Sequence, residues 1–177
     1  MRSVVIGSLV LLCGVAVAQP PRQPPAAQPL VKRTVDAFAG TWTGDATLGI
    51  PGKPLQKVKV TSTCHKIAGG AGVSCELKQH GKTSMPVDQT CLIGYDTEGS
   101  GVHLMCVTAA GEAHDHQGTW QRSDKIEFQP YKGTMMGKEA TEDLTFEWTS
   151  PKVFAAHGKT TLADGQTSTF DLILKKH

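Results

Sequence analysis

The sequence lacks an excess of either charge, since 18 Lys and Arg stand against 16 Asp and Glu. It also shows no basic stripe, the clustered positive charge that a nucleic-acid-binding surface requires, so nucleic acid is not expected as a partner. After residue 18 no apolar run approaches the about 20 residues that a membrane-spanning helix needs. We therefore expect no transmembrane segment in the mature chain. We also expect the protein to be a monomer.

Motifs of catalysis are also missing. The chain has no Gly-x-Ser-x-Gly nucleophile turn and no glycine-rich loop that would cradle a phosphate. Its carboxylates are scattered, so that no acid–base pair can be placed across a cleft. The sequence therefore favours a protein that is not an enzyme, and it predicts no catalytic residue and no cofactor.

The N-terminal segment has the pattern of a signal peptide over residues 1–18. Arg2 precedes a charge-free, almost wholly apolar run over residues 4–17, and small residues at Ala16 and Ala18 suit cleavage before Gln19. Residues 19–30 contain five prolines and no apolar periodicity, which predicts an extended tether. The remainder, residues 31–177, fits one domain of an exported protein, periplasmic or extracellular.

Four cysteines would remain after cleavage: Cys64, Cys75, Cys91 and Cys106. An even number in an exported chain indicates disulfides, and none of the spacings matches the close pairs of a zinc knuckle. We expect Cys64–Cys75 and Cys91–Cys106 bonds. A Cys75–Cys91 bond is the main alternative, because the strands that carry these residues are expected to be neighbours too.

The pattern of apolar residues predicts a short helix followed by many strands. Val31, Val35 and Phe38 recur at helical spacing, and the pattern stops at Gly40. From there apolar and polar residues alternate in short segments separated by Gly, Asp, Ser and Pro. About ten strands with short connections indicate an all-β fold, an antiparallel up-and-down barrel of about 8–10 strands, because closure removes exposed edges.

Turn chemistry predicts the register of three hairpins. A turn at Gly69-Gly70 places Cys64 opposite Cys75, and a turn at Glu98-Gly99 places Cys91 opposite Cys106. A three-residue loop ending at Gly165 matches the apolar residues of the last two strands. Each pair of cysteines then lies on the apolar face of its hairpin, and a slip of one residue would turn every side chain to the wrong face.

The start of the first strand, Gly40-Thr41-Trp42, resembles the calycin group of barrels, which includes lipocalins, fatty-acid-binding proteins and nitrobindin-like proteins. In that group a tryptophan at this position packs over the closed end of the barrel. A basic residue of the last strand often covers it, and the resemblance assigns that role here to Lys175, with Lys176 as the alternative.

A wider resemblance links the chain to an uncharacterised family of exported bacterial calycin-like barrel domains. It rests on Gly40-Thr41-Trp42, on Leu92-Ile93-Gly94-Tyr95-Asp96 before a turn, on Gly118-Thr119 and on the order of strands. It covers residues 38–176. The resemblance implies the fold and no particular chemistry.

His114 and His116 are the strongest candidates for a functional site. On a strand they share one face, and His-x-His can supply two nitrogen ligands to a metal. The sequence does not identify a third ligand, since His103 and His157 are expected on outer faces, so we assign no metal site and no haem. The hypothesis for ligand contact comprises His114, His116, Trp120 and Tyr95.

Residues expected inside the barrel are of mixed size. Gly118, Ala156 and Gly158 would leave a cavity. Large inward residues would fill it, namely Trp120, Phe128, Phe146, Trp148, Phe154 and Phe170. We expect an exported barrel that binds a small apolar ligand. The alternatives are a filled barrel that serves as a structural or interaction protein of the envelope and, with less support, a histidine-based metal or haem protein.

Overall fold

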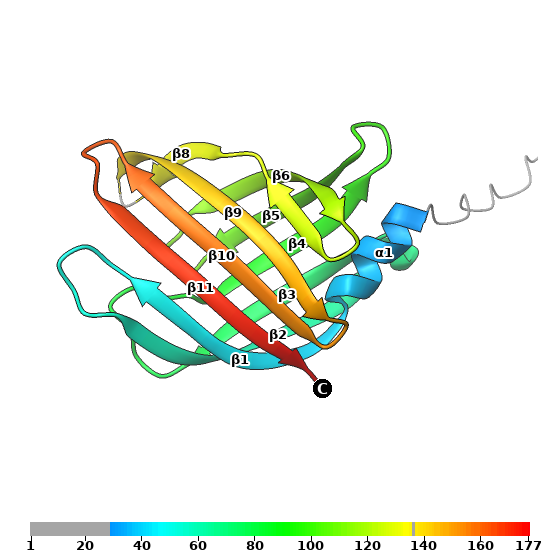
Figure 1. Cartoon of the computed structure of the whole chain (residues 1–177), viewed down its shortest axis with the longest axis horizontal. Helices are drawn as coiled ribbons and strands as arrows, with labels where there is room; N and C mark the ends of the chain where they lie inside the picture. The colour runs from blue at the N-terminus through cyan, green and yellow to red at the C-terminus, as the bar shows by residue number, and fades with distance from the viewer. Residues whose placement is uncertain (1–28, 136) are drawn as a thin grey trace, which may run out of the picture.

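The computed structural model describes residues 29–135 and 137–177 and consists mainly of β-strands (Figure 1). The elements in chain order are α1 (Pro29–Phe38), β1 (Gly40–Gly49), β2 (Gln56–Ile67), the short 3₁₀ turn η1 (Ala68–Gly70), β3 (Gly72–His80), β4 (Gln89–Asp96), β5 (Gly101–Thr108), β6 (Ala113–Arg122), β7 (Lys125–Phe128), β8 (Tyr131–Met135), β9 (Lys138–Ser150), β10 (Val153–Leu162) and β11 (Thr167–Lys176).

The strands form a closed antiparallel barrel. Neighbours in sequence pair from β1 to β7, β7 pairs with β9, and β9 continues through β10 to β11. The ring closes where β11 pairs with β1, for example at Leu174 and Gly44. Ten strands make up this ring, so the expected all-β up-and-down barrel with a short N-terminal helix is confirmed.

β7 and β8 together occupy one position in the wall. β7 pairs with residues 145–147 of β9, and β8 pairs with residues 138–142 of the same strand. Pro130 lies between them and has no N–H to donate to a ladder, which accounts for the interruption. The broken strand brings Tyr131 opposite Glu142, a pairing that shapes the site described below.

The predicted hairpin registers are confirmed. Cys64 pairs with Cys75 and Cys91 with Cys106. The last hairpin has its three-residue loop, and Gly165 has the positive φ of 81° that such a loop requires. Period-two alternation therefore placed the apolar face correctly over most of the wall.

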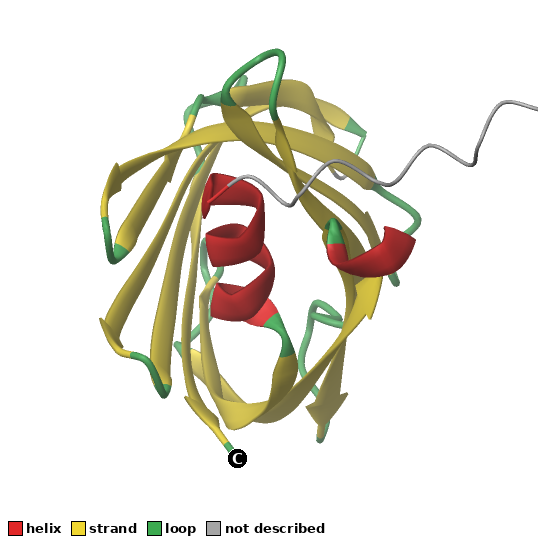
Figure 2. Ribbon diagram, turned by 90° about the vertical axis from the view of Figure 1, so that its right-hand side faces the viewer, coloured by secondary structure: helices red, strands yellow, loops and turns green. Residues whose placement is uncertain are grey.

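Helix α1 covers one end of the barrel, and Figure 2 views the molecule from that end. Its buried face presents Val31, Val35 and Phe38 to the interior, as the spacing predicts. The helix begins at Pro29, inside the segment expected to be a tether, because proline suits the first position of a helix, where no N–H partner is needed. The rest of that segment and the expected signal peptide, residues 1–28, lie outside the described residues.

The small residues expected to face inward have different roles. Ala156 lies in the wall of an interior cavity. Gly118 instead makes room for an aromatic ring, since a Cβ atom there would come within 2.7 Å of Phe128 Cδ1. Within residues 29–135 and 137–177, no helix has the length and apolar character needed to cross a membrane.

Candidate functional site

The barrel encloses a cavity of about 120 Å³ with a largely apolar wall. The apolar lining includes Phe38, Trp42, Leu77, Ile93, Leu104, Leu144, Phe146, Phe154, Ala156, Phe170, Leu172 and Leu174. The polar lining consists of Ser62, Gln89, His114, His116 and Glu142. An apolar cavity with a few convergent polar groups is the usual form of a small-molecule site.

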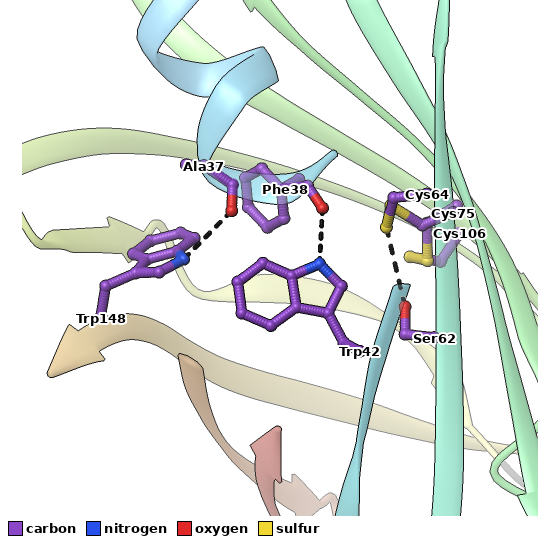
Figure 3. Close-up of a disulfide and its surroundings, with 9 residues drawn as sticks. Ala37, Phe38, Trp42, Ser62, Cys64, Cys75, Cys106 and Trp148 are labelled. Atoms are coloured by element: carbon purple, nitrogen blue, oxygen red, sulfur yellow. Dashed lines mark hydrogen bonds between the residues drawn. A yellow bond between two sulfur atoms is a disulfide. The ribbon is translucent and has the colours of Figure 1, made fainter. Parts of the chain in front are cut away.

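Aromatic side chains pack together at the α1 end of the barrel, and Figure 3 shows three of them, Phe38, Trp42 and Trp148. The indole N–H of Trp42 donates to the carbonyl of Phe38 at 2.7 Å, and that of Trp148 donates to the carbonyl of Ala37 at 3.3 Å. Phe38 packs edge-on against Trp148, with ring centroids 5.1 Å apart. These contacts satisfy the last carbonyls of the helix and anchor it as the cover of this end.

The four cysteines form one row across the cavity wall. Disulfides join Cys64 to Cys75 and Cys91 to Cys106, with Cα atoms 4.0 and 4.1 Å apart. These short separations are typical of non-hydrogen-bonded pairs, in which side chains come closest. Because pair types alternate across an antiparallel sheet, the Cys75–Cys91 pair is the wider, hydrogen-bonded kind. The register thus explains why the expected connectivity occurs and the alternative does not.

The row continues from Cys106 to His114, its partner on β6. His114 and His116 both face inward and are 7% and 3% exposed. Glu142 on β9 meets them from across the broken strand. Its Oε2 atom lies 3.3 Å from His114 Nδ1 and 3.5 Å from His116 Nε2. We call these three residues the HHE cluster.

The HHE cluster lies toward the barrel end that faces away from α1. Arg33 of α1 donates to the carbonyl of Arg122 at the C-terminal end of β6, whereas His114 is near the start of that strand. In the same way Trp148 of β9 contacts α1, and Glu142 comes earlier on β9. The cavity therefore has an aromatic, covered end and a polar end.

Two further side chains hold His114 in position. Tyr131 of β8 stacks on its ring with centroids 5.1 Å apart, and the Tyr131 hydroxyl donates to the carbonyl of Ala113 at 3.2 Å. Glu112 approaches the far side of the imidazole, with Oε2 3.7 Å from His114 Nε2. His114 is thus flanked by a carboxylate at each ring nitrogen.

The electrostatics of the two histidines differ. Close contact with the Glu142 carboxylate raises the pKa of His114 above its ordinary value, in opposition to burial. Burial lowers the pKa of His116, because desolvation outweighs the attraction of Glu142. His114 therefore takes up a proton more readily than His116.

The HHE cluster leaves three buried polar atoms without a hydrogen-bond partner among the described residues. They are His114 Nε2, His116 Nδ1 and Glu142 Oε2. The ion-pair distances within the cluster are short, but the atoms are not aligned as hydrogen bonds. Leaving a buried polar atom unpaired costs about 1–3 kcal/mol, and folds retain such groups chiefly where they serve a function.

The structure brings only part of the predicted ligand-contact set together. His114 and His116 line the cavity, whereas Trp120 and Tyr95 are not among the described residues that line it. Trp120 donates to Thr34 Oγ1 at 3.0 Å and stacks under the guanidinium of Arg33, at the helix end. Tyr95 is partly buried against the core near the C-terminal end of β4. A ligand contact by these two residues stays a prediction.

The barrel-end pair needs one correction. Trp42 is buried as the resemblance implied, but the cation over its ring is Lys176, whose Nζ lies 5.0 Å from the ring centroid, and not Lys175. Lys176 pairs with Trp42 across the β1–β11 ladder and shares its face, whereas Lys175 projects from the opposite face.

The two remaining histidines of interest lie outside the barrel, as expected. His103 is 3.7 Å from Asp115 and 3.9 Å from Asp96, and its side chain is 39% exposed. His157 is exposed and its Nδ1 lies 2.8 Å from Asp171 Oδ1. Neither contributes to the HHE cluster.

Glu142 is the functional candidate that sequence reasoning missed. The signal was present, because Glu142 continues the inward parity of Leu144, Phe146 and Trp148 toward the start of β9. An acidic residue on an inward face is uncommon and points to a specific partner. Its partners, however, are on β6, and only the closed and locally broken wall brings the two strands together.

A closed ten-stranded barrel with a helix at one end fits the calycin-like barrel fold. No family model and no curated protein matches the chain. Two solved structures support this fold. Rv2717c from M. tuberculosis aligns with a TM-score of 0.66 at 13% identity, over 86% of this chain and 99% of that one. The S-type phycobiliprotein lyase CPES from Guillardia theta aligns with a TM-score of 0.54 at 9% identity, over 83% and 92%.

Proposed function

We propose that this protein is an exported binding protein that holds one small, largely apolar molecule inside its barrel. The observation that carries the proposal is the cavity, which combines an apolar wall with a few polar side chains, among them the HHE cluster. Such a site accommodates a molecule with an apolar body and a polar end directed at His114, His116 and Glu142. The likeness of the fold to a phycobiliprotein lyase is compatible with binding of a small ligand.

The size of the cavity restricts the ligand. A cavity of about 120 Å³ is close to the engineered apolar cavity of about 150 Å³ that takes up benzene. We therefore expect ligands the size of a single ring or a short branched chain. A tetrapyrrole or a long acyl chain would require the barrel to open, because the aromatic residues around Phe38 fill the α1 end.

Export is the second part of the proposal. Two disulfides persist in an oxidising compartment such as the periplasm or the extracellular space. The composition of residues 1–18 supports secretion through a cleaved signal peptide. N-terminal sequencing of the protein isolated from its own cells tests this part, and a mature chain that begins at Gln19 is the expected result.

The alternative is a filled barrel with a structural or interaction role, and the aromatic residues at the α1 end favour it. Phe38, Trp148 and Phe154 pack against one another there, with ring centroids 5.0 to 6.0 Å apart. A filled barrel would bind nothing inside. The two functions therefore differ in one measurable property, occupancy of the cavity.

Native mass spectrometry of the protein from its own envelope tests occupancy, followed by thermal shifts with a panel of single-ring and short-chain compounds. The Ala156→Leu variant fills the cavity, whereas Ala155→Leu adds the same side chain on the outer face of β10. We expect a bound mass or a thermal shift that is lost in Ala156→Leu and kept in Ala155→Leu. An apo mass without any shift from the panel would instead establish the filled barrel. The same spectra test the expected monomer.

A further inference from the structure

We propose that His114 Nδ1, His116 Nε2 and Glu142 Oε2 bind a divalent first-row transition-metal ion, of which Zn²⁺ is the type case. One ligand atom from each of the three residues lies within 4.8 Å of the other two, and both histidines are buried. The inference goes beyond the binding of a small molecule and does not depend on it, since the ion itself is the ligand.

The separations of the two histidine nitrogens from Glu142 Oε2 suit ligands of one ion. With metal–ligand bonds of about 2.0–2.2 Å, two ligands of a tetrahedral zinc lie roughly 3.3–3.5 Å apart. The observed separations from Glu142 Oε2 are 3.3 Å to His114 Nδ1 and 3.5 Å to His116 Nε2.

The chemistry of the donors selects the class of metal. Two imidazole nitrogens and one carboxylate oxygen suit Zn²⁺, Fe²⁺, Co²⁺ or Ni²⁺. Ca²⁺ and Mg²⁺ prefer oxygen ligands alone, so these ions are poor candidates. The sulfur atoms of the neighbouring row are joined in disulfides and offer no thiolate.

The surroundings have the features of an outer shell. A ligating histidine usually gives its other ring nitrogen to a carboxylate. Glu112 Oε2 is the carboxylate oxygen placed to take this role, although at 3.7 Å from His114 Nε2 it is not hydrogen-bonded to it. Tyr131 stacks on the His114 ring and restricts its orientation. A metal would also satisfy Glu142 Oε2, which is buried and has no hydrogen-bond partner among the described residues.

Three protein ligands leave a position for a further one. All three residues of the HHE cluster line the cavity, so water or a polar group of a bound molecule could occupy that position from the cavity side. This open arrangement is typical of zinc sites that act on or bind a small molecule, in contrast to closed structural sites with four protein ligands.

The test uses the full chain without a polyhistidine tag, stripped with a chelator and kept oxidised. Calorimetric titration with ZnCl₂ should show one equivalent bound. Bound zinc should also raise the melting temperature of the protein. Titration with CoCl₂ should produce visible d–d absorption. X-ray absorption at the zinc edge should show nitrogen and oxygen neighbours, including imidazole, and no sulfur.

Variants locate the site. Glu142→Gln and His116→Gln remove one ligand each, and we expect a loss of affinity beyond the roughly 10- to 100-fold that removal of an outer partner causes. Glu112→Gln should fall within that range. His157→Gln alters an exposed histidine beside Asp171 and should bind as the parent does. Ala156→Leu should also retain the metal, although it is expected to lose the small molecule. This variant therefore tests the two proposals separately.

The inference fails if the stripped parent protein binds neither Zn²⁺ nor Co²⁺, in which case the HHE cluster is a buried ion pair. It also fails if Glu142→Gln and His116→Gln bind as tightly as the parent, or if the zinc spectrum contains sulfur. Should either variant not fold, the absorption spectra of the parent still decide between imidazole and other neighbours.

Discussion

Tyr131 stacks on His114, with the two ring centroids 5.1 Å apart and the planes 22° from parallel. This contact joins β8, the second half of a broken strand, to the start of β6. We expect Tyr131→Leu to lower the free energy of unfolding by about 1 kcal/mol through loss of the aromatic pair. Tyr131→Phe keeps the stack and should change the free energy of unfolding by less than about 0.5 kcal/mol, because only one exposed hydrogen bond is lost. Urea unfolding measures both, and equal losses would contradict the role of the stack.

Lys176 and Lys175 are matched neighbours on opposite faces of β11. Lys176→Ala removes the cation over Trp42 and should lower the free energy of unfolding by about 0.5–1 kcal/mol. Lys175→Ala removes an exposed lysine and should have a smaller effect. A larger loss of stability for Lys175→Ala than for Lys176→Ala in chemical denaturation would contradict the assignment of Lys176 as the cover of Trp42.

The disulfide between Cys91 and Cys106 spans 15 positions of the sequence. We expect the Cys91→Ala/Cys106→Ala double variant to be less stable by about 3 kcal/mol, the value for a loop of this length in the chain-entropy model. Peptide mapping of the parent under non-reducing conditions should recover Cys64–Cys75 and Cys91–Cys106 links. A Cys75–Cys91 peptide would refute the assigned pairing.

Asp36 of α1 contacts Lys32 and accepts a hydrogen bond from Lys66 at 2.8 Å, and these contacts hold its pKa at about 2, below the ordinary 3.8. A carboxyl group whose pKa is lower in the folded chain than in the unfolded chain stabilises the fold at pH values above the unfolded-chain pKa. This stabilisation is lost as the pH falls through the folded-chain pKa. The stability of the parent should therefore fall between about pH 4 and pH 2, and that of Asp36→Asn should fall less.

The pH dependence of Asp36 has a simple control in salt. The group is substantially exposed, so the difference between parent and variant should be modest and should shrink at high ionic strength, where exposed charges are screened. An acid profile of Asp36→Asn identical to that of the parent would show that the Lys66 contact does not link α1 to β2 in solution.

Most of the wall could be predicted because strand registers depend on local chemistry. Turn residues at Gly69-Gly70 and Gly165, together with alternation, placed the cysteines and the last hairpin correctly. The boundary of α1 was less predictable, since Pro29 serves equally well in a tether and at the first position of a helix. The break at Pro130 was not predicted.

The candidate site could be predicted only in part. His114 and His116 were found because both lie on one strand and share its face. Their partner Glu142 lies on a strand that the chain reaches only after β7 and β8, and no local pattern relates the two. The resemblance left both Lys175 and Lys176 open for the cover of Trp42, and the register of β1 with β11 places Lys176 on the face of Trp42.

By itself the sequence determined the all-β class, the inward face of most strands and the placement of two cysteines opposite each other in each of two hairpins, because these follow from period-two alternation and from turns a few residues long. The choice between the two disulfide connectivities came from the structure. Only the tertiary structure decided which inward polar residues meet. Glu142 and His116 are far apart in the chain. Closure of the barrel and the interrupted strand bring Glu142 Oε2 to 3.5 Å from His116 Nε2. That contact depends on the curvature and order of ten strands, which no single segment encodes.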